Sequence, residues 1–326
     1  MTEIRPPSGE HPLDRSFSLE AVRVTEAAAI AAYAQIGRGN EHDADQAAVE
    51  AMRAAFNVLH IDGTVVIGEG ERDEAPMLFI GEKVGRGGLA VDIALDPLEG
   101  TTLTAKAMAN ALAVMAMAEP GTMLHAPDTY MDKIAIGPGY QPGIIDLDAE
   151  PADNINAIAK AKGMKANELT VCVMDRPRHE ELIAKIRKTG AAVALITDGD
   201  VAGVIATTDP ITGIDMYIGQ GGAPEGVLAA AALRCIGGQM QGRLIFKKDD
   251  EKRRAEKIGI KDFNRKYSMR ELVAGDVVFS ATGVTDGSML KGVHRDGDYV
   301  TTESVVMRSA TGTVRYIKAS HRRALG

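Results

Sequence analysis

Helical and strand-like segments alternate regularly through the second half of this 326-residue chain. The expected helices span 153–163, 179–188 and 200–206, and the expected strands span 169–174, 192–196 and 213–218. A regular exchange of these two segment types predicts an α/β fold.

The first half alternates less regularly. An Ala-rich helix is expected at 19–36 and a second helix at 44–60, with strands at 64–67, 89–95 and 111–118. Short strands close the chain, with a hairpin expected at 299–307 and 312–318. A Pro- and Gly-rich stretch near residues 137–143 suggests a boundary between two halves. We therefore expect a flexible tail at 1–16, an N-terminal α/β half at 17–150 and a C-terminal α/β half at 151–326.

Composition excludes several classes of function. The formal net charge is −8 and aromatic residues make up 4% of the chain, so neither a basic nor an aromatic nucleic-acid surface is expected. No apolar run reaches the length of about 18 residues that a membrane span needs. Because the N-terminus lacks an apolar signal core, we expect a cytoplasmic protein whose two cysteines, Cys172 and Cys235, are buried thiols.

The hexapeptide Asp96-Pro97-Leu98-Glu99-Gly100-Thr101 follows an apolar strand and carries the strongest chemical signal. A strand ending at Asp96 would put this carboxylate at the sheet edge where α/β proteins bind ligands. Pro97 would turn the chain, exposing the Leu98 carbonyl and returning Glu99 to the same side. A helix beginning at Gly100 and Thr101 would offer N–H groups to a phosphate. The alternative is an ordinary turn between a strand and a helix.

A second acidic segment follows the strand at 64–67. Four acids occur within six residues, including Glu69 and Asp73, beside Gly68 and Gly70. Such a segment is usually a solvated surface loop, but a divalent cation would also relieve its charge repulsion. Two acidic segments at strand ends predict a site for Mg²⁺ or Mn²⁺, which prefer oxygen ligands.

Three further segments carry candidate ligand-binding residues. The Gly-rich run 220–226 places Glu225 at a helix start, where it is a helix-capping acid or a further metal ligand. Arg176 and Arg178 are suited to a second phosphate, or are solvated arginines at a helix start. Asp198 and Asp200 could accept hydrogen bonds from sugar hydroxyls or cap the next helix.

These segments together resemble the class II fructose-1,6-bisphosphatases. The resemblance covers about residue 20 to the C-terminus, in the order GEGERDEAPM, DPLEGT, TYMDKI, DRPRH, TDGDV and GGAPEG. The DPLEGT turn alone is also typical of the wider lithium-sensitive phosphatase superfamily, which includes inositol monophosphatases. The full set is more specific than that single turn.

The resemblance implies a layered αβαβα sugar-phosphatase fold, a homodimer or homotetramer, and Mn²⁺ or Mg²⁺ as cofactor. The implied metal ligands are Asp45, Glu69, Asp96, Leu98 through its carbonyl, Glu99 and Glu225. The implied catalytic residues are Asp45, Asp73 and Thr101. The implied substrate contacts are Glu99, Gly100, Thr101, Tyr130, Arg176, Arg178, Asp198, Asp200 and Gly222.

The resemblance also implies a reaction, in which water removes the 1-phosphate of fructose 1,6-bisphosphate during gluconeogenesis or carbon fixation. Sedoheptulose 1,7-bisphosphate, alone or as a second substrate, and an inositol phosphate remain alternative substrates. A non-catalytic sugar-phosphate-binding protein is the alternative from another class of function. Its weakness is that a phosphate binder has no use for so many carboxylates.

Two positions depart from the family pattern. Glu41 stands where a Lys is expected, four residues before Asp45, and so reverses the charge beside that carboxylate. Arg176 stands where Lys is frequent, which keeps the charge and changes the geometry. The first departure leaves open whether the segment around Glu41 contacts phosphate.

Overall fold

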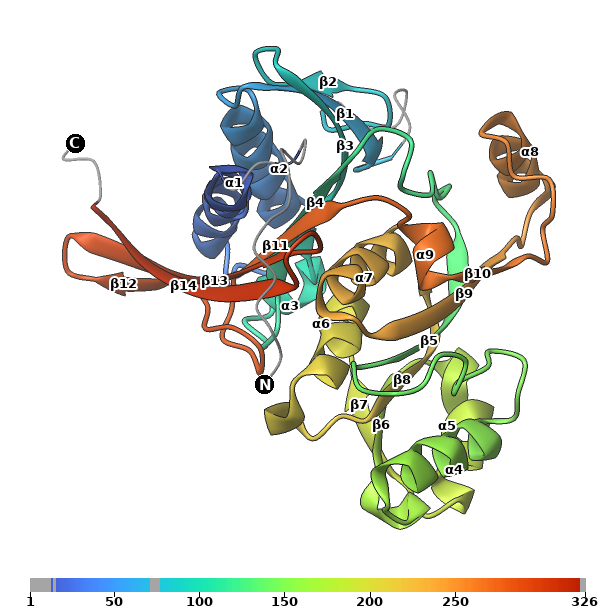
Figure 1. Ribbon diagram of the computed structural model, residues 1–326. Coiled ribbons are helices and arrows are strands. Elements are labelled where there is room, and N and C mark those ends of the chain that lie inside the picture. Colours follow the sequence, from blue (N-terminus) through green and yellow to red (C-terminus); the bar gives the residue numbers. More distant parts are fainter. Residues whose placement is uncertain (1–12, 14–15, 71–76, 323–326) are drawn as a thin grey trace. The chain divides into compact units, whose positions relative to one another are not determined.

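The computed structural model describes residues 13, 16–70 and 77–322 (Figure 1). It divides into two compact units, one built from the described residues up to Met123 and from Gly275 onward, the other from Leu124–Ala274. This division differs from the single cut at residue 150 that we expected. The C-terminal strands return to the first unit, because β11 (Val277–Gly283) pairs with β4 (Leu112–Ala118) along its whole length.

The first unit contains an eight-stranded mixed sheet. Its order is β12-β13-β11-β4-β3-β1-β2, with β14 also paired to β13. The remaining elements of this unit are α1 (Ser16–Tyr33), α2 (Glu41–Phe56), β1 (Ile61–Ile67), β2 (Lys83–Val84), β3 (Leu89–Glu99), α3 (Thr101–Ala105), β12 (His294–Asp296), β13 (Tyr299–Arg308) and β14 (Thr313–Arg322).

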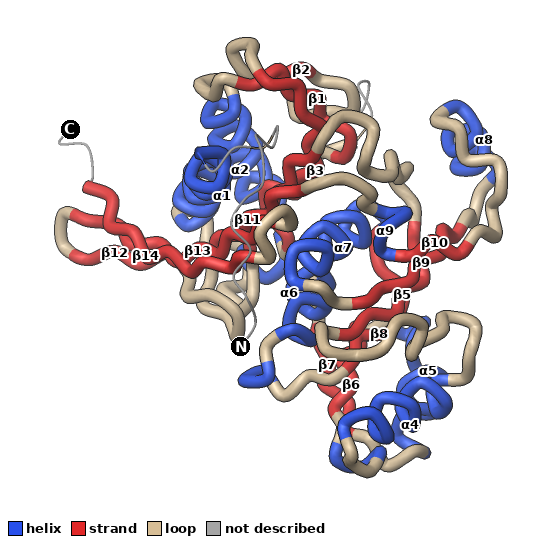
Figure 2. The backbone as a smooth tube through the Cα atoms, in the orientation of Figure 1, coloured by secondary structure: helices blue, strands red, loops and turns tan. Residues whose placement is uncertain are grey.

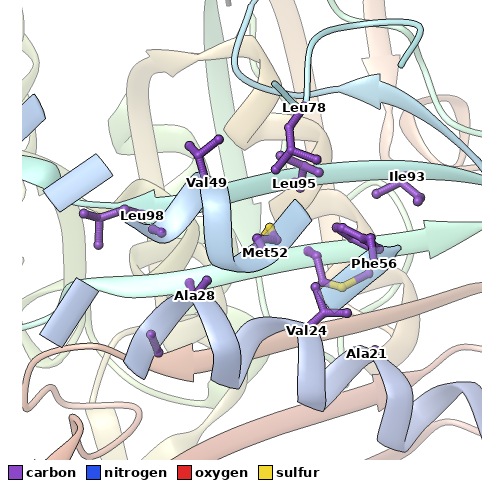
Figure 3. Packing of buried hydrophobic residues seen from close by; sticks show 14 of the residues in the cluster. Ala21, Val24, Ala28, Val49, Met52, Phe56, Leu78, Ile93, Leu95 and Leu98 are labelled. Carbon is purple, nitrogen blue, oxygen red and sulfur yellow. The ribbon is translucent and has the colours of Figure 1, made fainter. Parts of the chain in front are cut away.

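The core of this unit lies between the sheet and the two long helices. Figure 3 shows Val24 of α1 and Met52 and Phe56 of α2 facing side chains of the sheet. Small alanines on α1 let the helix backbone approach the strands closely. The buried Thr25 hydroxyl of α1 lies 3.0 Å from the Ser280 hydroxyl on β11, so this buried polar group has a partner.

The helix α2 begins three residues earlier than expected. Asn40 caps it by accepting a hydrogen bond from the Asp43 amide at 3.2 Å. Glu41 and Asp43 therefore lie in the first helical turn, where acidic side chains interact favourably with the helix dipole. The helix ends at Phe56, short of the expected residue 60.

The second unit contains a six-stranded sheet in the order β10-β9-β5-β8-β6-β7. Its strands are β5 (Tyr130–Ile136), β6 (Thr170–Met174), β7 (Ala192–Ile196), β8 (Met216–Gly222), β9 (Gln239–Ile245) and β10 (Lys266–Ser268). Its α-helices are α4 (Pro151–Lys162), α5 (Glu180–Lys188), α6 (Asp200–Ile205), α7 (Ala223–Ile236), α8 (Asp249–Lys257) and α9 (Met269–Leu272). Its 3₁₀ turns are η1 (Ala166–Glu168), η2 (Pro177–His179), η3 (Ala206–Thr208) and η4 (Pro210–Thr212).

Helices cover both faces of this second sheet (Figure 2). Val171 and Val173 of β6 contribute to a core with Ile158 of α4 and Ile186 of α5. Cys172, between those two valines, belongs to the opposite face, where it lies close to Gly203 of α6. The predicted α/β alternation is therefore confirmed, as is the mixed α/β fold class of the chain.

The strand before the Gly-rich run has other bounds than expected. The strand expected at 213–218 begins at Met216 and continues to Gly222, because residues 130–135 of β5 pair with it to that point. The helix that begins within the Gly-rich run 220–226 starts at Ala223, with Pro224 in its first turn. The Gly-rich segment is thus the end of a strand that passes directly into a helix.

Both cysteines of the chain lie in the second unit. Cys172 and Cys235 are both buried free thiols, and burial raises the pKa of the Cys172 thiol to about 12. No helix among the described residues is long and apolar enough to cross a membrane.

Candidate active site

The carboxyl ends of β1 and β3 bring two of the predicted acidic segments to one sheet edge. The two strands are parallel, and Ile67 at the end of β1 pairs with Ala94 on β3. Glu69 and Asp96 each lie two residues beyond this pair. The parallel register therefore places both carboxylates at the edge where α/β sheets bind ligands.

The strand β3 does not end at Asp96 but runs to Glu99 with a bulge. Asp96 pairs with Val114 and Glu99 with Leu112, so β3 has one more residue between the pairs than β4 has. The Asp96 Oδ1 accepts a hydrogen bond from the Leu98 amide at 3.0 Å, which stabilises the bulge. We expected the strand to end before Pro97. Instead Pro97 lies within the bulge, and β3 continues to pair with β4 as far as Glu99.

The turn after this bulge is also defined. Gly100 has φ +92°, a left-handed conformation that favours glycine, and α3 begins at Thr101 as expected. Glu99 is buried, whereas Asp96 and Thr101 are half-buried. The motif therefore presents a carboxylate and a hydroxyl next to a short helix.

The acidic loop after β1 is anchored at its base. The Glu69 amide donates to the Leu78 carbonyl at 3.1 Å, and the Ile80 amide donates to the Gly70 carbonyl at 2.9 Å. The Leu78 amide in turn donates to the buried carboxylate of Glu82. Asp73, predicted to act on the attacking water, lies outside the described residues.

Asp45 and Glu41 lie one turn apart on α2, so they share a face of that helix. Burial raises the pKa of Asp45, and the nearby His42 opposes this shift in part. Glu41 accepts a hydrogen bond from the Thr102 hydroxyl at 2.9 Å. Glu41, which stands where the family pattern has Lys, is thus hydrogen-bonded to the residue directly after Thr101 in the first turn of α3.

Among residues 13, 16–70 and 77–322, no three acidic, histidine or cysteine side chains converge closely enough to hold a metal ion. Glu69 and Asp96 therefore lie along one sheet edge, but they are not close enough to a third such side chain in the described part of the chain to form a preformed metal site. Their assignment as metal ligands stays a prediction.

The second unit contains a buried charged cluster at the junction of β8 and α7. The ammonium group of Lys133, on β5, is fully buried and pairs with the Asp200 carboxylate of α6. It also donates to the Gly222 carbonyl at 2.7 Å, while the Tyr217 hydroxyl lies 3.4 Å from Asp200 Oδ2. Asp200 was expected to contact sugar hydroxyls, yet its Oδ2 is engaged inside the protein.

Two glycines let carboxylates approach the backbone at this junction. A Cβ atom at Gly221 would overlap Asp200 Oδ2, and one at Gly222 would overlap Glu225 Oε2. Neither position adopts a left-handed conformation, so the effect of a side chain here would be to displace these carboxylates and not to strain the backbone. The Gly-Gly pair predicted as a ligand loop is therefore needed for internal packing as well.

Glu225 has the chemistry of a cation ligand. Its Oε2 is enclosed and has no hydrogen-bond partner within the part of the chain that the structure describes. Burial raises the pKa of Glu225, and the nearby Asp200 carboxylate raises it further. A buried carboxylate oxygen without a donor fits a bound divalent cation.

The two arginines of the DRPRH motif have different partners in this unit. The Arg178 guanidinium donates to the Gln220 carbonyl at 2.8 Å and lies 5.0 Å from the centre of the Tyr130 ring. Arg176 approaches Asp198 at 3.9 Å. The structure thus brings Tyr130 and Arg178 together, and pairs Arg176 with Asp198.

The comparisons with known proteins agree with these features. The family described as bacterial fructose-1,6-bisphosphatase, glpX-encoded, matches residues 15–321. The chain is 48% identical over 323 residues to fructose-1,6-bisphosphatase 1 class 2 of Escherichia coli strain K12, covering 94% of this chain and 95% of that relative. Fructose-1,6-bisphosphatase class 2 of Shigella flexneri gives the same values.

This chain belongs to the glpX-encoded bacterial fructose-1,6-bisphosphatase family. The resemblance found in the sequence motifs is therefore confirmed.

Two residues of this fructose-1,6-bisphosphatase family member were missed from sequence. His179 is buried; its Nδ1 lies 2.7 Å from the Met174 carbonyl, and its Nε2 accepts from the Gln220 amide at 2.8 Å. Burial lowers its pKa, which favours the neutral ring that this pair of contacts needs. His179 lies in the motif DRPRH and Lys133 in the motif TYMDKI. Their place in these motifs was the sequence signal that could have marked them as candidates.

We predict that Lys133→Met strongly destabilises this fructose-1,6-bisphosphatase family member. The substitution leaves the Asp200 carboxylate buried without its cation, which typically costs about 3–5 kcal/mol. Urea unfolding followed by circular dichroism measures the loss. The double variant Lys133→Met/Asp200→Asn should recover a large part of it, because the unpaired charge is gone.

The matched control is Lys185→Met, which removes a solvent-exposed lysine paired with Glu150 and Glu181. Its effect on unfolding should be far smaller, because water screens a surface pair. Equal stabilities of Lys133→Met and the wild type would show that the buried pair does not stabilise the fold.

Proposed function

We propose that this chain hydrolyses the 1-phosphate of fructose 1,6-bisphosphate to fructose 6-phosphate and inorganic phosphate. The observation that carries the proposal is the 48% identity, over 94% of the chain, to an enzyme named for this substrate. The acidic residues at the shared edge of β1 and β3 support it, because carboxylates can hold divalent cations. Such cations would offset the repulsion between an acidic protein and an anionic phosphate.

We assign the metal-ligand role to Asp45, Glu69, Asp96, the Leu98 carbonyl, Glu99 and Glu225. The enclosed Glu225 oxygen fits this role, and oxygen ligands of this kind suit Mn²⁺ or Mg²⁺. When bound, the divalent cation neutralises charge on the phosphate oxygens and makes a water molecule more acidic.

The residues around Thr101 bind the scissile phosphate and orient the attacking water. The Thr101 hydroxyl orients the attacking water, which approaches phosphorus in line with the departing C1 oxygen. The amides of Gly100 and Thr101 donate to the phosphate oxygens as charge accumulates on them. Asp45, or alternatively Asp73, helps Thr101 to orient this water and accepts its proton.

The second unit supplies the sugar and distal-phosphate contacts. Arg178 and Tyr130 have the strongest support for this role, because their side chains lie in contact at the start of β5. Arg176, Asp198 and Gly222 complete the set. Asp200 supports this segment through Lys133, and a direct contact with a sugar hydroxyl remains our prediction for it.

Several finer assignments accompany this proposal. A cytoplasmic homodimer or homotetramer acting in gluconeogenesis or carbon fixation is the expected setting. Two arginines favour a bisphosphate over an inositol phosphate, and sedoheptulose 1,7-bisphosphate is the alternative or additional substrate. The reaction itself is best tested by phosphate release from a panel of sugar phosphates.

We expect this activity to depend wholly on a divalent cation. Removing metal with a chelator should abolish phosphate release from fructose 1,6-bisphosphate, and adding Mn²⁺ or Mg²⁺ should restore it. The same titration followed by thermal unfolding should raise the melting temperature, because a ligand that binds only the folded state stabilises it. Full turnover by the metal-free protein would contradict the proposal.

Asp96→Asn is the sharpest substitution in the first unit. The amide oxygen of Asn can still accept the hydrogen bond from the Leu98 amide, so the bulge is expected to persist. The loss of charge should lower kcat by about a thousandfold, which corresponds to roughly 4 kcal/mol of transition-state stabilisation. Unfolding curves provide the control, and a near-normal kcat would exclude Asp96 as a ligand.

The reversed charge at Glu41 should make the enzyme require more metal. Glu41→Gln keeps an acceptor for the Thr102 hydroxyl and removes the charge, whereas Glu41→Lys reverses it. We expect both variants to lower the Mn²⁺ concentration that gives half activity, and Glu41→Lys to lower it more than Glu41→Gln. The decrease should be a few-fold at most, because solvent and salt screen much of the interaction. An unchanged titration curve would mean that the Glu41 charge does not reach the metal or the substrate.

A further inference from the structure

Two cationic side chains lie against the same aromatic ring in the second unit. The Lys247 ammonium is 3.8 Å from the centre of the Tyr130 ring, and the Arg178 guanidinium carbon is 5.0 Å from it. The three residues come from different segments: Tyr130 begins β5, Arg178 lies in η2, and Lys247 follows β9. Lys247 lies outside the sequence motifs that carry the expected site residues.

The sheet register explains why these segments meet. Tyr130 is paired with Gly222 of β8 on one side and with Ile245 of β9 on the other. Lys247 lies two residues beyond Ile245, and the Thr129 hydroxyl donates to the Ile245 carbonyl. The end of β9 is thus held beside the start of β5, and the following residues reach the Tyr130 ring.

Hydrogen bonds hold the main chain of Lys247 and the side chain of Arg178. The Lys247 amide donates to the Glu251 carboxylate at 2.6 Å, which fixes the chain where β9 leads into α8. The Arg178 guanidinium is held by its hydrogen bond to the Gln220 carbonyl. The fold therefore brings the Lys247 backbone next to the Tyr130 ring, and the Lys247 side chain reaches the ring from there.

The contact with the Tyr130 ring distinguishes Lys247 from the lysines and arginines that follow it. Further along α8, Lys252 approaches Asp249 and Arg253 approaches Asp250. Lys247 forms no ion pair with any residue of the described ranges 13, 16–70 and 77–322. Two cations thus lie against one exposed aromatic ring, an arrangement that attracts an anionic group of a ligand.

We propose that Lys247 binds the phosphate of the substrate that is not hydrolysed, together with Arg178 and Tyr130. This inference rests on the proposed function and adds a residue to it. Lys247 then acts as a specificity residue, because a sugar phosphate with a second phosphate gains a contact that a monophosphate at C1 lacks. A lysine supplies a point charge beside the directional guanidinium of Arg178.

The test is Lys247→Gln, with Lys248→Gln as the matched control on the adjacent, equally exposed lysine. A lost charge-assisted contact should raise KM for fructose 1,6-bisphosphate by about tenfold, with a smaller change in kcat. Fructose 1-phosphate, which lacks the distal phosphate, should show a much smaller change. Lys247→Arg should retain most of the affinity, and Lys248→Gln should match the wild type.

Direct binding separates this inference from the proposed function. Isothermal titration of fructose 6-phosphate should give a Kd about tenfold weaker for Lys247→Gln than for wild type. An equal Kd in the two proteins would overturn the role of Lys247 even if the wild type hydrolyses the bisphosphate. Equal losses on both substrates would overturn it too, because they would place Lys247 at the scissile phosphate. Absence of bisphosphate hydrolysis in the wild type would instead contradict the proposed function, and the Kd comparison would still decide the inference.

Discussion

The ion pair between Lys133 and Asp200 is the interaction on which the second unit's candidate site depends. It lies fully inside the protein, and the same ammonium group holds the Gly222 carbonyl at the end of β8. Glu225, Gly222 and the Tyr130 strand are all arranged around it. A buried pair of this kind does little for net stability compared with apolar packing, but it fixes one geometry because either charge alone would be costly.

The glycines beside this pair show how packing and chemistry share the same residues. Gly221 and Gly222 leave room for the carboxylates of Asp200 and Glu225, so a larger side chain would displace both acids. The enclosed Glu225 oxygen is the consequence of that close approach. The segment thus combines a strand end, a helix start and a candidate ligand within a few residues.

The sequence predicted the order and type of most elements because periodicity and glycine positions are local signals. It failed where a distant partner decides the outcome: β4 keeps β3 in the sheet beyond Asp96, and β5 extends β8 to Gly222. The candidate residues were found by motif, yet the pairing of Lys133 with Asp200 could not be, since 67 positions separate them. Whether Asp200 meets a ligand depends on that pairing, which no local pattern reports.

The discontinuous first unit has a consequence for how the chain is made. During synthesis from the N-terminus, β4 emerges more than 150 residues before its neighbour β11, whereas all strands of the second sheet lie within one continuous segment. The second unit can therefore complete its sheet on the ribosome while β4 still presents an unpaired edge. An apolar edge left open in this way is prone to association with other chains, so the nascent protein is exposed to aggregation until β11 has been made.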